Sequence, residues 1–417
     1  MIGFVALAFI IRLPLLAHPD YTNFPEFYRD YYIADHITRG QWPLAGPPSM
    51  QTNFRFGPIY YYLLVPLFIL SIKNPISLLL TGIILYALSA GVCYRLLQKW
   101  FKDEYAARAG ALFYAVSIYG LHLTSYISNP NFLPLFILLF LFFLAKILEG
   151  SWSPADFILL GLWYGVAAQL HATAALVLPV IAVWPLWKAL KSRPWGDIAK
   201  KLLAAGSTAA LSAAPYLIYQ IQTKFLGLTA LLRFSKQHLQ GEHFSAATSA
   251  LADFFSAALN PFDISRDYAY LQPNWLYVFI AAAAILAMIA LLWNIFAKRQ
   301  QAAPGAIITP NGRYFASAWL LTICLMVLLF NRGIHDHYLI ILWPWPALLF
   351  AYSSQWLRQK LAITTAFLVL FVVIWSLQAY SLFAKPRENW NDVIALYHVR
   401  YQNEPATANI GFSAIQQ

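Results

Sequence analysis

The chain has 417 residues, of which 60% are hydrophobic and 11% charged, and its net charge is +11. Because soluble domains carry about 25% charged residues, this composition excludes a soluble globular protein and indicates an integral membrane protein. The basic residues are spread over short loops between apolar runs, a distribution that indicates how the spans are oriented in a membrane. They form no basic patch, so we expect no nucleic-acid partner.

About eleven apolar runs approach the roughly 20 residues that a membrane-spanning helix requires, so the sequence predicts an all-α polytopic membrane protein. The runs are 2–17, 75–97, 106–126, 132–147, 155–170, 172–186, 202–221, 275–296, 314–330, 338–356 and 361–383. The first run has no basic region or cleavage site before the later spans, so we expect it to be retained. It begins almost at Met1, which is compatible with a few further residues upstream.

The run 57–72 is apolar but reaches only roughly 24 Å as a helix, short of a hydrocarbon core near 30 Å. It fits either a further span or a helix lying in the membrane interface. Treating it as non-spanning places five basic loops on one side, as the positive-inside rule requires. We therefore expect a juxtamembrane helix here.

This assignment predicts one transmembrane domain over 1–383, followed by a short extracytoplasmic tail over 384–417. Within the domain, residues 18–74 form a first outer loop with juxtamembrane helices, and residues 222–274 form a large outer loop. We expect a multi-pass protein of a bacterial inner or plasma membrane, with its active face outside the cytoplasm. Cys93 and Cys324 fall inside spans and are expected to be buried apolar residues.

Four of the 17 acids lie in the stretch 18–56: Asp20, Glu26, Asp30 and Asp35. In a chain with so few ionisable groups, an acid cluster beside the first span is a candidate site.

Asp30 is followed by an apolar pattern that is typical of an amphipathic helix on the membrane surface, formed by Ala34, Ile37, Trp42 and Leu44. Its carboxylate can serve as a general base if partial burial under aromatic residues raises its pKa. The alternative is a solvated acid that balances Arg29 or Arg39.

Three short sequence motifs resemble those of a known family: Asp30 to Pro43, Asn53 to Tyr62, and Ser128 to Asn131. They resemble the lipid-sugar-dependent glycosyltransferases of the GT-C superfamily, near the protein O-mannosyltransferase and aminoarabinose-transferase branches, glycosyltransferase families 39 and 83. Asp30 matches the acid that opens the family's first outer-loop pattern, and the matching residues that follow are Ala34, Gly40, Trp42, Pro43 and Gly57 to Tyr62. The chain departs from the pattern at Tyr31, where the family usually has Glu, at Gly57, which replaces a Pro, and at Asn129 or Asn131, where an Asp is common.

The turn Asn331 to Tyr338 resembles the family's late outer motif, which implies recognition of a polyprenyl phosphate by Arg332, His335 and His337. A guanidinium fork and imidazole N–H groups suit a phosphate. The pair of histidines with Asp336 is weak evidence for a metal, and an ordinary polar turn is equally compatible. We expect no cofactor.

His171 and Arg55 are further candidates for the donor phosphate, although His171 is also suited to capping a helix. Further substrate contacts are expected from Glu26, Asp35, Asn129 and Tyr338. Arg12 lies near the outer end of the first run, a position that permits its side chain to snorkel to the interface.

The resemblance implies an inverting-type transferase that moves a sugar from a polyprenyl-phosphate donor to a lipid, glycan or protein acceptor, with Asp30 as the base. Two alternatives remain open at this point: a flippase or transporter for lipid-linked sugars, and a polysaccharide polymerase or ligase.

Overall fold

A computed structural model describes the residues 1–17, 24–49, 54–101, 103–191, 193–229, 309, 312, 314–315, 317, 340–341 and 344–357. The predicted tail 384–417, the predicted spans 275–296 and 361–383, and the outer loop beyond Thr229 lie outside these residues, as do Asp20 and Cys324.

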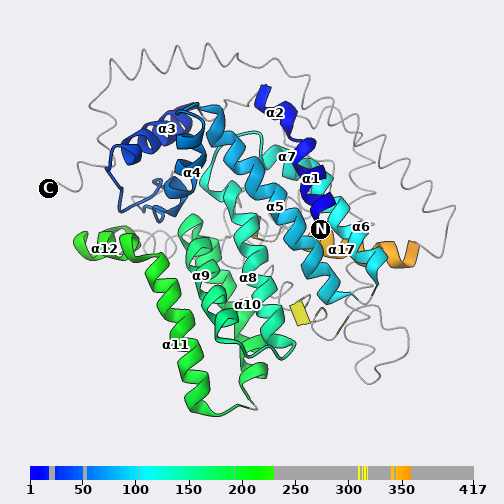
Figure 1. Cartoon of the computed structure of the whole chain (residues 1–417). Coiled ribbons are helices and arrows are strands. Elements are labelled where there is room, and N and C mark those ends of the chain that lie inside the picture. Colours follow the sequence, from blue (N-terminus) through cyan, green and yellow to red (C-terminus); the bar gives the residue numbers. More distant parts are fainter. Residues whose placement is uncertain are drawn as a thin grey trace, which may run out of the picture.

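The described residues are mostly helical (Figure 1). The helices are α1 (Ile2–Ile10), α2 (Leu13–Ala17), α3 (Phe24–Thr38), α4 (Ile59–Leu70), α5 (Ile76–Trp100), α6 (Glu104–Val116), α7 (Ile118–Leu123), the 3₁₀-helix η1 (Asn129–Phe132), α8 (Leu133–Leu148), α9 (Pro154–Leu170), α10 (Ala172–Leu190), α11 (Trp195–Ser212), α12 (Ala214–Gln222) and α17 (Pro344–Leu357). The all-α prediction is confirmed for this part of the chain. Within the described ranges, three helices are long and apolar enough to cross a membrane, and the bent pair α11 and α12 would make a fourth; the expected count of about eleven is not confirmed.

Three of the predicted runs are interrupted. The run 2–17 divides into α1 and α2, the run 106–126 divides at Ser117, and the run 202–221 bends by 68° between α11 and α12. The Ser117 side chain accepts a hydrogen bond from the Gly120 amide and thereby caps α7. Pro215 lies in the first turn of α12, where its missing N–H costs no hydrogen bond.

The helices pack around α8, which lies against α5, α9 and α10, while α11 covers α9 and α1 covers α5 (Figure 1). Gly161 and Gly165 let α9 and α11 approach closely, because a Cβ at Gly161 would lie 2.0 Å from the Ala205 carbonyl oxygen. The core of this bundle is apolar and aromatic, and Cys93 is buried in it as expected.

The position of Arg12 permits snorkelling, but its side chain is 0% exposed and lies inside the bundle. Its guanidinium donates to the carbonyls of Ala8 and Ala115 at 2.8 Å each, donates to Thr124 Oγ1 at 3.1 Å, and lies 4.0 Å from the centre of the Tyr86 ring. The break at the end of α6 supplies the Ala115 carbonyl, since the last carbonyls of a helix have no intrahelical partner.

The basic loops of the described residues gather at one end of the bundle, away from α3 and α4 (Figure 1). Two ion pairs join helix ends there, Lys99 with Glu149 and Lys146 with Asp156, while Lys201 pairs with Asp197 inside α11. This arrangement agrees with the common side that was predicted for these loops.

The helix α4 has 12 residues and therefore measures about 18 Å, too short to cross a hydrocarbon core. It packs against α3, at the end of the bundle opposite the basic loops (Figure 1). Both helices thus suit the juxtamembrane position that the sequence predicts.

Candidate functional site at helices α3 and α4

The acid-bearing helix α3 is shorter at its C-terminal end than the apolar pattern predicts. Ala34 and Ile37 are buried as expected, but Trp42 lies beyond the helix and is 55% exposed. Gly40 has a φ of +86°, a left-handed conformation that glycine adopts without strain and that commonly ends helices. The expected amphipathic helix therefore ends at Thr38.

Asp30 is 0% exposed and both of its carboxylate oxygens have partners. Arg29 donates to Oδ1 at 2.8 Å, and the Tyr60 hydroxyl donates to Oδ2 at 2.5 Å. The alternative of a solvated acid is therefore wrong, although the expected pairing with Arg29 is present. Burial raises the pKa of Asp30, while the Arg29 charge and the hydrogen bonds from Arg29 and Tyr60 lower it.

Two tyrosines of α4 complete the surroundings of Asp30, and the sequence alone assigned them no role. The Tyr60 ring packs against Phe132 with centroids 5.2 Å apart, which fixes the hydroxyl that Asp30 accepts from. Tyr61 is buried, and it interacts electrostatically with Arg29, Asp30 and Arg55. The run of three tyrosines in an apolar helix was the available signal.

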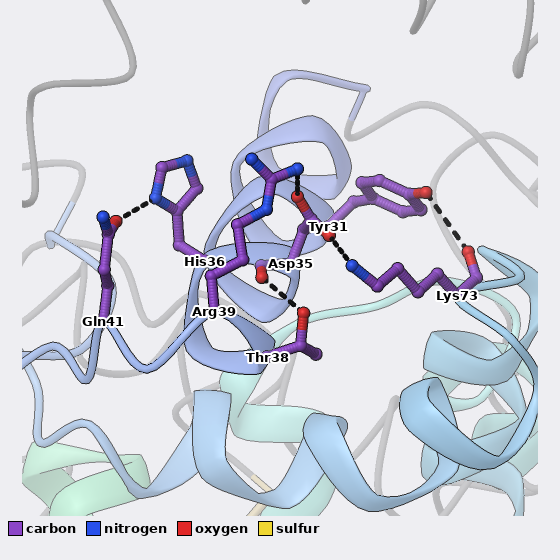
Figure 2. A network of polar contacts seen from close by, with 7 residues as sticks. All are labelled: Tyr31, Asp35, His36, Thr38, Arg39, Gln41 and Lys73. Carbon is purple, nitrogen blue, oxygen red and sulfur yellow. Dashed lines mark hydrogen bonds and ion pairs between the residues drawn. The ribbon is translucent and has the colours of Figure 1, made fainter.

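Asp35 belongs to a separate polar network at the C-terminal end of α3, which Figure 2 shows. Lys73 donates to its Oδ1 at 2.6 Å, Arg39 donates to its Oδ2 at 2.5 Å, and the Tyr31 hydroxyl donates to the Lys73 carbonyl at 3.2 Å. This network fastens α3 to the turn between α4 and α5. The substrate contact expected from Asp35 stays a prediction.

The loop before α4 carries Arg55 and brings it to the junction of α9 and α10. The Phe56 ring stacks on the His171 ring with centroids 5.7 Å apart, and the Gly57 amide donates to the Gln169 carbonyl at 3.0 Å. The Tyr216 hydroxyl donates to the Arg55 carbonyl at 2.7 Å, so α12 also holds this loop. Arg55 thereby lies within electrostatic reach of Tyr61.

His171 caps α10, which was one of its two interpretations. The Thr173 amide donates to His171 Nδ1 at 3.3 Å, and the ring is buried. Next to it, Asn129 Nδ2 donates to the Leu170 carbonyl at 2.6 Å. The donor-phosphate role of His171 and the substrate role of Asn129 stay predictions.

The structure thus links five of the predicted site residues at one end of the bundle: Glu26, Asp30, Arg55, Asn129 and His171. Four others, Arg332, His335, His337 and Tyr338, lie outside the described residues. Among the residues that are described, no group of three or more His, Cys, Asp or Glu side chains could hold a metal ion.

Comparisons with known proteins agree with this architecture. Residues 56–219 match the family model of dolichyl-phosphate-mannose-protein mannosyltransferases, a segment that begins directly after Arg55 and ends in α12. Among curated proteins, none matches the sequence.

Three solved structures are similar to the chain. The oligosaccharyltransferase of Archaeoglobus fulgidus in complex with zinc and sulfate aligns with a TM-score of 0.55 and 15% identity, over 96% of this chain and 55% of that one. The oligosaccharyltransferase AglB of the same organism, in complex with an inhibitory peptide and a dolichol-phosphate, aligns with a TM-score of 0.50 and 13% identity, over 100% of this chain and 55% of that one. ArnT from Cupriavidus metallidurans, bound to undecaprenyl phosphate, aligns with a TM-score of 0.42 and 16% identity, over 84% of this chain and 76% of that one.

The chain spans about half the length of the archaeal proteins, and at these identities the likeness concerns the fold. The match of residues 56–219 to the mannosyltransferase family model and the similarity of the fold to the archaeal oligosaccharyltransferase confirm the resemblance seen in the sequence.

Proposed function

We propose that the protein is a membrane glycosyltransferase that moves a sugar from a polyprenyl-phosphate donor to an acceptor, on the face of the membrane where α3 and α4 lie. The observation that carries this proposal is the acid pair of α3, partly exposed Glu26 and buried Asp30, next to tyrosines and to Arg55 at one end of an apolar bundle. Paired acids of raised pKa beside a cation suit general-base chemistry on a phosphate-linked substrate.

The lipid carrier fits an apolar helical bundle, since each buried methylene contributes about 0.8 kcal/mol. The similar archaeal structure holds a dolichol-phosphate, which supports a donor of the same chemical class. A soluble nucleotide sugar would require no such apolar setting.

In the proposed reaction, an acid of α3 accepts the proton of the acceptor hydroxyl or amine. The acceptor atom forms a bond to the anomeric carbon while the bond from that carbon to the phosphate oxygen breaks. Its electron pair leaves with the polyprenyl phosphate. Arg55 and His171, together with Arg332, His335 and His337, are proposed to stabilise this anion.

The test uses purified protein in lipid nanodiscs with polyprenyl-phosphate-linked sugars, and mass spectrometry of the released polyprenyl phosphate and the sugar product. We expect protein-dependent release, lowered by at least about 100-fold in the double variant Glu26→Gln/Asp30→Asn. Glu104→Gln, a matched change at the opposite end of the bundle, is expected to retain the rate. A donor that the unchanged protein leaves intact, or moves between leaflets without cleaving it, would exclude a transferase.

A further inference from the structure

The two acids of the proposed site occupy one face of α3 but differ in how their carboxylates are engaged. Arg29 and Asp30 stand three and four residues after Glu26, so both side chains neighbour that of Glu26 on the helix surface. Glu26 is partly exposed, Arg29 is 26% exposed at its side chain, and Asp30 is fully buried.

Asp30 has no carboxylate oxygen left over for a substrate. Arg29 occupies Oδ1 at 2.8 Å and the Tyr60 hydroxyl occupies Oδ2 at 2.5 Å, both inside the packed contact of α3 with α4. A general base must come within hydrogen-bond reach of the proton that it removes. Asp30 is 0% exposed, so an acceptor could reach a remaining lone pair of its carboxylate only by opening this packed contact.

Glu26 lies one helical turn before Asp30 at the partly open end of the same face, and it makes no ion pair at 4.0 Å or less in the described residues. Its charge interacts with both Arg29 and Asp30. Glu26 is therefore the acid of this face that remains accessible to an acceptor.

The Tyr61 hydroxyl is an independent observation that favours a ligand here. It is buried, and its O–H has no acceptor in the part of the chain that the structure describes, because Arg29, which interacts with it, can only donate; Asp30 and Arg55 lie within electrostatic reach. Buried hydroxyl groups without a partner are rare in native proteins, and they are explained when a ligand supplies the missing bond.

We propose that Glu26 is the catalytic residue that takes the acceptor's proton, that Asp30 is a positioning residue holding Arg29 and Tyr60, and that the Tyr61 hydroxyl donates to the phosphate-linked substrate. This inference rests on the proposed transfer reaction. The proton passes from the acceptor to the Glu26 carboxylate as the bond to the anomeric carbon forms, and the phosphate oxygen departs with the electron pair of the broken bond.

The electrostatics of the face agree with this division. Burial raises the pKa of Glu26, the Arg29 charge lowers it, and the Asp30 charge raises it. Because only the ionised carboxylate accepts a proton, the rate rises with pH as Glu26 loses its own proton. The midpoint of the acid limb of the pH–rate profile is therefore expected at a pH above about 4.3, the ordinary pKa of glutamate.

The test compares single variants in the transfer assay over a range of pH. Glu26→Gln is expected to lose at least about 100-fold in kcat, with little change in the donor KM, and to lose the acid limb. Asp30→Asn keeps one acceptor oxygen for Arg29, and its amide NH2 can donate to the Tyr60 hydroxyl oxygen, so it is expected to lose less than about tenfold and to keep the acid limb. Glu26→Asp, which shortens the carboxylate by one methylene, is expected to retain part of the rate and the limb.

The reverse pattern would overturn the inference. In that pattern, Glu26→Gln keeps a rate within about threefold of the unchanged protein, while Asp30→Asn loses most of kcat and the acid limb of the pH–rate profile. If Glu26→Gln does not fold, a Glu26→Asp variant with an unshifted limb and full rate overturns it equally. Failure of the proposed function itself is distinguishable, because the unchanged protein would then release no polyprenyl phosphate.

Discussion

Arg29→Met is expected to lower the free energy of unfolding by about 3 to 5 kcal/mol, because it leaves the buried Asp30 carboxylate without its counter-charge. Asp30 is 0% exposed, and the remaining Tyr60 hydroxyl cannot compensate a full charge. Adding Asp30→Asn to this variant removes the uncompensated charge and keeps an acceptor for Tyr60, so most of the loss is expected to be recovered. Denaturation with sodium dodecyl sulfate, followed by circular dichroism, measures both changes.

The loss in Arg29→Met also depends on pH. Without the cation, the folded-state pKa of Asp30 rises further above its unfolded value, so the folded protein binds more protons than the unfolded chain. Stability therefore falls as the pH rises from the unfolded value of about 3.9 through the folded one. The loss of unfolding free energy in Arg29→Met should therefore be smallest at acidic pH.

Arg108→Met is the matched control, because Arg108 pairs with Glu104 while both side chains are exposed. Exposed pairs contribute about 0 to 1 kcal/mol. A cost of Arg29→Met no larger than that of the control would contradict the burial of the pair between Arg29 and Asp30.

Gly46→Ala is expected to destabilise the loop that carries Arg55, with a cost of about 1 to 3 kcal/mol. A Cβ at Gly46 would lie 2.0 Å from the Gly57 carbonyl oxygen, and only a shift of the backbone relieves that contact. The Gly46 amide donates to the Phe56 carbonyl at 2.8 Å, so the shift displaces Arg55 and the stacking of Phe56 on His171. We therefore expect a higher donor KM as well as a lower melting temperature.

Gly206→Ala is the control for this substitution, since nothing lies within 4 Å of the added Cβ. Alanine favours a helix over glycine by about 1 kcal/mol, so this variant is expected to be at least as stable as the unchanged protein. Equal stability and equal donor KM in the two variants would mean that the Gly46 contact does not position Arg55.

The sequence is most informative where length and hydropathy decide the structure. The length of the run 57–72 left a further span open, and the distribution of the basic loops favoured a helix in the interface; α4, with 12 residues, suits that position. The break before α12 was missed although Pro215 was available as a signal, because the apolar run continues across it.

The contacts of the site were less predictable. The sequence offered both Arg29 and Arg39 as partners of Asp30. Neighbouring residues on a helix do not face each other, so spacing did not favour Arg29, and it did not select Tyr60 as the third partner. Spacing does place Glu26 on the face of Arg29 and Asp30, yet only the burial of Asp30 shows that the two acids differ. The burial of Arg12 could not be predicted, because the Ala115 carbonyl that it donates to becomes available only where α6 ends in the folded protein.

The central claim is that the end of the bundle formed by α3 and α4 handles the phosphate-linked sugar, and a cryo-EM map of the protein with a bound polyprenyl phosphate tests it most directly. We expect density for the phosphate beside Arg55 and the Tyr61 hydroxyl, with room for a sugar toward Glu26. Phosphate density among Lys99, Lys146 and Lys201 at the opposite end would contradict the account.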